Sequence, residues 1–240
     1  MPTTLIGKIR AHSPLNSFAL KMLMAALMLL DHIHLFVPDA PYWFHQLGRL
    51  VAPVFVFLMT EGMVHTRSRE KYLLRLYVAA GVMQAGNFAL QLLLGKAPAN
   101  NIFLSLALAA TAIHAIDCLK TPHQGQQQAW LYAGALLLSV AGSYLVEGRY
   151  ICLIGALVCY YLRKKPWLMC FAFVAAQGAY LLLLGRLWKT QGLMLFAVVF
   201  FLLYNGKKGT AHPAGKYFFY IFYPLHIWLL FILQQKIFLA

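Results

Sequence analysis

The chain has 240 residues and a net charge of +14; 62% of the residues are hydrophobic and 11% are charged. A mean hydropathy of +0.69 excludes an ordinary soluble domain, and apolar stretches of about 17 to 25 residues recur along the chain, as in polytopic membrane proteins. These stretches lack the two-residue alternation of transmembrane β-strands, so they predict helices. Because the basic residues lie in short loops between the stretches, the charge indicates membrane topology rather than nucleic-acid binding.

We therefore predict an all-α fold, a polytopic transmembrane helical bundle that forms one membrane-embedded domain over residues 1–240. Residues 1–16 are expected to be a basic cytoplasmic arm, because an N-terminus inside the cell places most of the 20 Lys and Arg residues on the cytoplasmic side. About nine helices are expected; eight or ten are also open, since the short sixth could merge with the fifth into a re-entrant pair. The predicted spans are 18–37, 46–65, 70–94, 100–119, 128–146, 148–162, 166–185, 190–205 and 215–238.

Ionisable residues of opposite sign flank the turn between the first two spans. Asp31 lies seven residues before the first proline of that turn and Arg49 lies eight after the second, so an antiparallel hairpin sets both at similar depth. Such residues are costly in lipid-length helices and usually face a bundle interior or a water-filled cavity. We expect Asp31 to pair with Arg49. Lys21 and Glu61 are expected to form a second pair roughly 15 to 18 Å further along.

His32 follows Asp31 and is the candidate base. A neutral imidazole accepts a proton near neutral pH, and an adjacent carboxylate stabilises the imidazolium. Neighbours on a helix point about 100° apart, so Asp31 could either orient His32 or serve Arg49 and leave His32 for chemistry. The alternative is that these groups only hold two helices together.

The last span places a second histidine near the middle of the membrane. Tyr220, Tyr223 and His226 are three residues apart and share one side of the helix, and Pro224 leaves a backbone acceptor without its usual donor. An aromatic belt explains the tyrosines but not His226 at that depth. We interpret His226 as a second active-site histidine with Tyr223 beside it; packing beneath Pro224 is the alternative.

A basic segment follows the second span, at the predicted cytoplasmic face. It contains Arg67, Arg69, Lys71 and Arg75. Such side chains suit the phosphates of a nucleotide-like cofactor, although positive-inside charge or contact with anionic lipid also explains them. In the fourth span, His114 and Asp117 are interpreted as helix–helix hydrogen-bonding groups. No metal-ligand spacing appears, so no metal site is predicted.

These features resemble the TraX family of F-pilin acetylases. The motifs are Lys21…Met28-x-x-Asp31-His32, Gly48-Arg49-Leu-Val-Ala-Pro53-Val-Phe55, Glu61-Gly62…Thr66-Arg67…Lys71-Tyr72…Arg75-Leu76 and Tyr220-Ile-Phe-Tyr-Pro-Leu-His226. The resemblance covers most of the chain from about Leu20 and is strongest in the first third and the last helix. It implies a multi-pass enzyme of the bacterial inner membrane that uses acetyl-CoA to N-acetylate pilin subunits of conjugative pili.

The expected mechanism is acetyl transfer within the membrane. Acetyl-CoA would dock its phosphates on the basic segment, and His32 would deprotonate an acceptor amine, with Asp31 and Arg49 setting its geometry. His226 and Tyr223 would stabilise the oxyanion or relay the proton; direct transfer and an acetyl-histidine intermediate both fit. Two other classes compete: a proton- or solute-coupled transporter, which ordinarily shows repeated halves and broken helices, and a non-catalytic pilus assembly factor.

Overall fold

The computed structural model describes residues 10, 12–121, 125–209 and 213–238, and this part of the chain is almost entirely helical. Nine helical segments follow one another in it, and each falls on one predicted span, so the predicted all-α bundle is confirmed. They are α2 (Ser17–Phe36), α3 with α4 (Tyr42–Gly48 and Val51–His65), α5 (Arg69–Leu94), α6 (Ile102–Leu119), α7 (Gln126–Leu145), α8 (Arg149–Leu162), α9 (Pro166–Leu183), the 3₁₀ helix η1 with α10 (Thr190–Ala197 and Val198–Leu203), and α11 (Pro213–Leu233) with the π-helical turn η2 (Gln234–Phe238).

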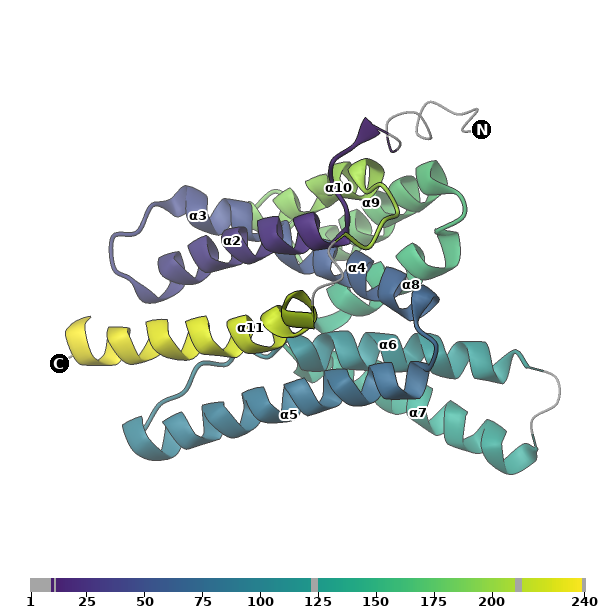
Figure 1. Cartoon of the computed structure of the whole chain (residues 1–240), viewed down its shortest axis with the longest axis horizontal. Coiled ribbons are helices and arrows are strands. Elements are labelled where there is room, and N and C mark those ends of the chain that lie inside the picture. Colours follow the sequence, from purple (N-terminus) through teal and green to yellow (C-terminus); the bar gives the residue numbers. More distant parts are fainter. Residues whose placement is uncertain (1–9, 11, 122–124, 210–212, 239–240) are drawn as a thin grey trace.

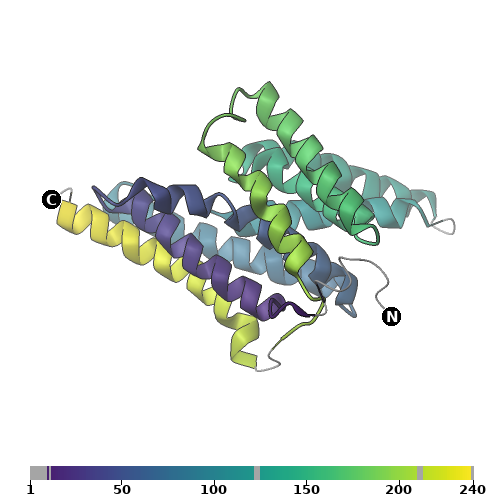
Figure 2. The ribbon, with the colours of Figure 1, turned by 90° about the horizontal axis from the view of Figure 1, so that it is seen from above.

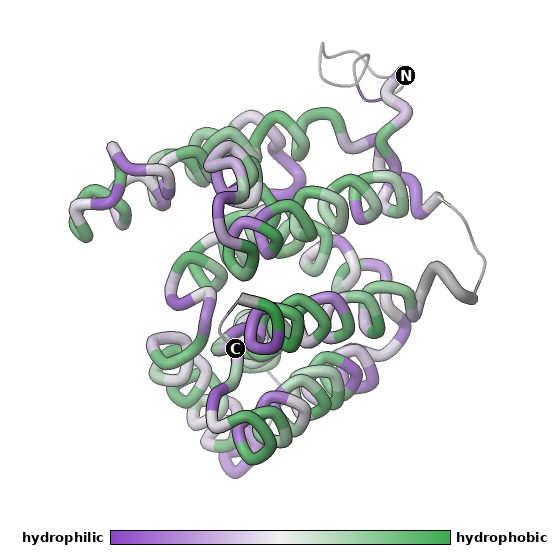
Figure 3. The backbone as a smooth tube through the Cα atoms, turned by 90° about the vertical axis from the view of Figure 1, so that its left-hand side faces the viewer, coloured by the Kyte–Doolittle hydropathy of each residue, from purple (hydrophilic) through white to green (hydrophobic). Residues whose placement is uncertain are grey.

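The segments differ in whether they are long and apolar enough to cross a membrane. Within the described residues, six are long and apolar enough: Ser17–Phe36, Tyr42–His65, Arg69–Leu94, Ile102–Leu119, Pro166–Leu183 and Tyr217–Ile237. The 14 residues of α8 rise only about 21 Å, short of a hydrocarbon core of roughly 30 Å. Viewed nearly end-on in Figure 3, apolar residues occur on helices throughout the bundle, as expected for a protein surrounded by lipid.

Side-chain caps and turn residues set the helix boundaries. Asn16 and Ser68 accept hydrogen bonds from the first-turn amides of α2 and α5, and Asn101 does so for α6, which satisfies amides that have no partner within the helix. The helix α5 ends at Gly95, whose φ of +70° is the left-handed conformation that glycine adopts without a steric penalty.

The predicted arm at residues 1–16 lies mainly outside the described residues, which lack residues 1–9 and 11. The junction between this arm and α2 is attached to the segment after α10. The Ser17 amide donates to the Lys207 carbonyl at 2.9 Å, and the Asn205 side chain donates to the Ser13 carbonyl at 3.0 Å. This contact closes the start of α2 onto the end of α10. The orientation of the bundle in the membrane stays a prediction.

The long helices run along the longest axis of the molecule, and distant parts of the sequence meet there. Figure 1 shows α2, α5, α6 and α11 along this axis, and α2 lies beside α11 in the view from above (Figure 2). Helix α6 packs against α4, α5, α7 and α8, and four of its alanines are fully buried: Ala107, Ala109, Ala110 and Ala112. Small residues allow such close approach between membrane helices.

The second predicted span, 46–65, is broken in the structure. It starts earlier, at Tyr42, and divides into α3 and α4 at Arg49–Leu50. A Cβ atom at Gly48 would overlap the Asp31 carboxyl group, so glycine allows α3 to lie directly against α2. The break ends the straight antiparallel hairpin on which the second charge pair was predicted. That pair is wrong: these two described residues, Lys21 and Glu61, form no ion pair.

Candidate active site

A cavity of about 160 Å³ lies where α2, α4, α6, α11, η1 and the turn between α7 and α8 converge. Its lining includes Asp31, His32, Arg49, Glu147 and Tyr223. Two elements that are too short to cross a membrane, α8 and η1, also line this cavity. The fold therefore gathers four of the five predicted catalytic residues at one cavity.

The fifth predicted residue, His226, lies directly behind His32. Their rings are 2.7 Å apart between His32 Nδ1 and His226 Nε2, and both side chains are buried. On the far side, His226 Nδ1 lies 2.6 Å from the carbonyl oxygen of Phe222. Both histidines were predicted, but their direct contact was not.

The hydrogen bonds assign the tautomers of the pair. The Phe222 carbonyl can only accept, so His226 Nδ1 carries the proton and donates. A neutral His226 then presents a lone pair at Nε2, which accepts from Nδ1–H of His32. In neutral His32 this leaves a lone pair on Nε2, for which the described part of the chain supplies no donor. Because His32 lines the cavity, the arrangement produces an oriented base there.

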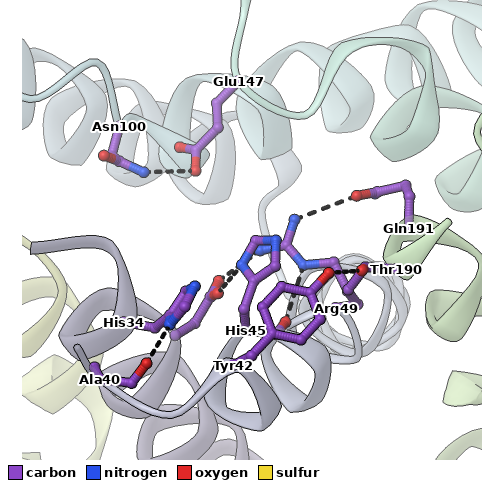
Figure 4. A network of polar contacts seen from close by, with 10 residues as sticks. His34, Ala40, Tyr42, His45, Arg49, Asn100, Glu147, Thr190 and Gln191 are labelled. Atoms are coloured by element: carbon purple, nitrogen blue, oxygen red, sulfur yellow. Dashed lines mark hydrogen bonds and ion pairs between the residues drawn. The ribbon is translucent and has the colours of Figure 1, made fainter. Parts of the chain in front are cut away.

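Asp31 serves Arg49 rather than His32. Arg49 Nη2 lies 2.7 Å from Asp31 Oδ2, and His45 Nδ1 lies 2.8 Å from Asp31 Oδ1. Arg49 also donates to the Gln191 side chain of η1 at 3.2 Å, and the hydroxyls of Tyr42 and Thr190 are in hydrogen-bond contact. Figure 4 shows how these groups join α3 to η1. The Asp31–Arg49 pair predicted by counting is confirmed, and His226 is the orienting partner of His32.

Glu147 was missed by sequence reasoning. Located in the turn between α7 and α8, it resembles an ordinary interfacial residue, and the only available signal was that acidic residues number six in the whole chain. Its Oε1 accepts a hydrogen bond from the Asn100 side chain at 3.0 Å, and its Oε2 accepts one from the backbone N–H of Asn101 at 2.7 Å. The Glu147 side chain is exposed and lines the cavity, and Figure 4 shows it facing the Arg49 group from the opposite wall.

Tyr223 holds Glu147 in place. Its hydroxyl donates to Glu147 Oε2 at 3.1 Å and accepts from the Ile102 amide at 2.9 Å. Its ring packs edge-on against His32, with 6.4 Å between ring centroids. With its donor already engaged, this hydroxyl is placed to position the carboxylate more directly than to stabilise an oxyanion.

The basic segment lies away from the cavity. None of its four cationic residues lines it. Arg69 is bound at 2.7 Å to Asp117 and at 2.6 Å to the Tyr160 hydroxyl, whereas Arg67 and Lys71 are exposed. The helix α4, whose 15 residues rise about 22 Å, separates the two regions. Their role in cofactor binding stays a prediction.

The fold and the cavity define a multi-pass membrane protein with a paired-histidine site inside its helical bundle. The sequence matches the TraX protein family over residues 17–234, so the chain belongs to the TraX family. It is 28% identical over 238 residues to the probable fimbrial assembly protein FimC, serogroup H1, of Dichelobacter nodosus, with 90% of this chain and 94% of that protein covered. No solved structure matches the chain.

Proposed function

We propose that this protein is an acetyltransferase of the bacterial inner membrane. It moves an acetyl group from acetyl-CoA to an amine, and the N-terminus of a pilin subunit is the acceptor that family membership favours. The observation that carries the proposal is the hydrogen-bond chain from the Phe222 carbonyl through His226 to His32, which lines the cavity. A positioned neutral imidazole is the usual general base near neutral pH.

The reaction needs one proton acceptor at the point of attack. Acetyl-CoA supplies the acyl group as an activated thioester. As the neutral amine nitrogen bonds to the carbonyl carbon, His32 Nε2 takes the proton that the nitrogen loses. The carbon–sulfur bond breaks, and His32 returns this proton to the departing sulfur. His226 accepts from Nδ1–H throughout, so it stabilises the imidazolium form of His32 as it develops.

The cavity suits the reacting end of acetyl-CoA rather than the whole molecule. A volume of about 160 Å³ is below the roughly 300 to 1,000 Å³ of pockets that enclose drug-sized ligands. We assign the acetyl group, the end of its carrier arm and the amine to this space, and the nucleotide to a position outside it. Arg67, Lys71 and Arg75 are the residues we propose for its phosphates, with the flexible arm passing along the bundle.

The proposal is tested by comparing pilins from cells with and without this protein by mass spectrometry. An N-terminal mass increase of one acetyl group that depends on the protein, and on His32, supports it. Purified protein with labelled acetyl-CoA and a pilin N-terminal peptide provides the direct assay. Label that never reaches the peptide contradicts the proposal.

The relative's name favours a second candidate, a pilus assembly factor without catalysis. The two are separated by a folded His32→Ala protein. An enzyme loses acetylation in this variant, whereas an assembly factor supports pili as well as the unaltered protein does and leaves pilin mass unchanged throughout.

A further inference from the structure

The charges that line the cavity do not balance. Arg49 is the only cationic side chain among the described lining residues, and it faces two carboxylates, Asp31 and Glu147. Asp31 is in direct contact with Arg49 at 2.7 Å, whereas Glu147 forms no ion pair in the described part of the chain. With the histidines neutral, the lining carries one excess negative charge.

Glu147 is held rigidly although no cation contacts it. All three of its hydrogen-bond donors are neutral: the Asn100 side chain, the Asn101 amide and the Tyr223 hydroxyl. The backbone is fixed as well, because the Gly148 amide donates to Ser105 Oγ at 2.9 Å. A Cβ atom at Gly148 would meet the Cys152 sulfur and the Ser105 side chain. The turn is therefore built to present this carboxylate at one position.

The surroundings of Glu147 favour a positive partner. Desolvation by the protein raises the pKa of its carboxyl group, and the hydrogen bonds from Asn100, Asn101 and Tyr223 and the more distant Arg49 act in the opposite direction. A carboxylate whose charged form is disfavoured by its surroundings is stabilised when a cation binds beside it. At neutral pH an N-terminal amine arrives mostly as a cation, since its ordinary pKa is about 7.7 to 8.0.

We propose that Glu147 is the binding group for the positively charged amine of the acceptor, and holds it across the cavity from His32. The substrate class in this inference rests on the proposed acetyl transfer. The ammonium donates to Glu147 and gives up one proton, to this carboxylate and then to solvent, which leaves the neutral amine that attacks. His32 takes the second proton as the carbon–nitrogen bond forms. The competing role is structural, because Glu147 also accepts from Asn101, the N-cap residue of α6.

Binding of two matched peptides to the full-length protein in detergent separates these roles. One pilin N-terminal peptide carries a dimethylated amine, which keeps its charge and forms no stable amide; the other carries a neutral acetylated N-terminus. We expect the unaltered protein to bind the charged peptide at least about tenfold more tightly, equal to about 1.4 kcal/mol, and Glu147→Gln to lose that preference. The Gln oxygen can still accept from Asn101 and Tyr223, and Asn100 can turn its amide to match.

Asp117→Asn is the matched control, because it removes a carboxylate at the other end of the bundle and should keep the preference. An unchanged preference in Glu147→Gln overturns the inference. Acetyl transfer by the unaltered protein is measured separately. If that protein transfers no acetyl group but Glu147→Gln still loses the preference for the charged peptide, the proposed function is rejected and the amine-binding site is kept.

A second test uses only the unaltered protein, so it does not depend on how a variant folds. Carbodiimide couples a carboxylate to an amine in contact with it, and fragment mass spectrometry locates the bond. A peptide with a free N-terminus should couple at Glu147. Coupling only at other carboxylates contradicts the inference.

Discussion

Two arginine–aspartate pairs lie toward opposite ends of α4, and their geometry is nearly the same. Arg49 contacts Asp31, and Arg69 contacts Asp117, each at 2.7 Å. Each pair joins separate segments of a chain that is mostly apolar: Asp31 of α2 pairs with Arg49 at the break between α3 and α4, and Arg69 of α5 pairs with Asp117 of α6. Their surroundings differ: the first lines the cavity that also holds His32, and the second does not.

The second pair is saturated by its own neighbours. Asp117 accepts from Arg69 and from the hydroxyls of Tyr160 and Tyr161, which are 2.6 and 3.0 Å away. This network ties α5, α6 and α8 together and leaves neither carboxylate oxygen without a donor. The first pair has similar contacts but borders open space and a second carboxylate. Ion pairing alone therefore does not identify a functional site in this bundle; an adjoining cavity with an oriented base is the distinguishing feature.

The largest expected effect is loss of the base at the cavity. His32→Ala should reduce acetyl transfer by about 100- to 10,000-fold, because a positioned general base contributes that much. Turnover is measured with labelled acetyl-CoA on protein shown to be folded by its thermal transition. His114→Ala, which removes a histidine from the other region, should retain activity. Equal turnover in both variants would reject the mechanism.

The partner behind the base gives the next largest effect. His226→Ala removes the acceptor for Nδ1–H of His32, and we expect turnover to fall by about 10- to 100-fold, below the loss of the base itself. His226→Gln offers an amide oxygen as acceptor and should recover part of the rate. If His226 only packs beneath Pro224, both variants should lower the melting temperature and leave the turnover and its pH profile unchanged.

Much of this architecture follows from the sequence, because lipid forces apolar stretches of sufficient length into helices. The Asp31–Arg49 pair was also predictable, since both residues are counted from the same turn. Such counting failed for Lys21 and Glu61 because the break after Gly48 depends on contact between α3 and α2, a tertiary feature. Local arithmetic is reliable only up to the first irregularity in a helix.

The rest of the site depends on packing between distant segments. His32 and His226 are 194 residues apart, and the relative register of α2 and α11 decides whether they touch. Glu147 becomes part of the site only through α6 and α11, which supply Asn101 and Tyr223. In the other region, the sequence does not distinguish Arg69 from the other cations of the basic segment. Its ion pair with Asp117 depends on how α6 packs against α5. Periodicity within one segment carries no information on these contacts.

Stability should also separate the two pairs. Arg49→Ala leaves Asp31 with His45 as its remaining partner, whereas Arg69→Ala leaves Asp117 with two tyrosine hydroxyls. The Asp31 side chain is 17% exposed and that of Asp117 is 24% exposed. These exposures lie between those of surface pairs and fully buried pairs. We therefore expect Arg49→Ala to lower the free energy of unfolding by about 1 to 3 kcal/mol, and Arg69→Ala to lower it by less than about 1 kcal/mol.

Thermal unfolding in detergent measures the difference between these variants. Adding Asp31→Asn to Arg49→Ala should recover part of the lost stability, because it removes the carboxylate left without its cation. A double variant no more stable than Arg49→Ala would show that the pair is not a stabilising unit.

The smallest expected effect is on acetyl-CoA binding at the basic segment. Arg67, Lys71 and Arg75 are changed together to Gln, while Arg69 is kept because its loss would also disturb Asp117. Arg67 and Lys71 are exposed, and exposed charges are screened by salt. We therefore expect affinity for acetyl-CoA to fall by about 3- to 10-fold at low salt and by less at high salt. Equilibrium binding of labelled acetyl-CoA measures this change in affinity, with a charge-matched change of Lys207, Lys208 and Lys189 to Gln as the control.

Because the basic segment lies about one helix length from the cavity, turnover at saturating acetyl-CoA should be unchanged in the triple variant. Unaltered affinity at every salt concentration would place the nucleotide elsewhere and leave Arg69 and its neighbours as a structural and lipid-facing region.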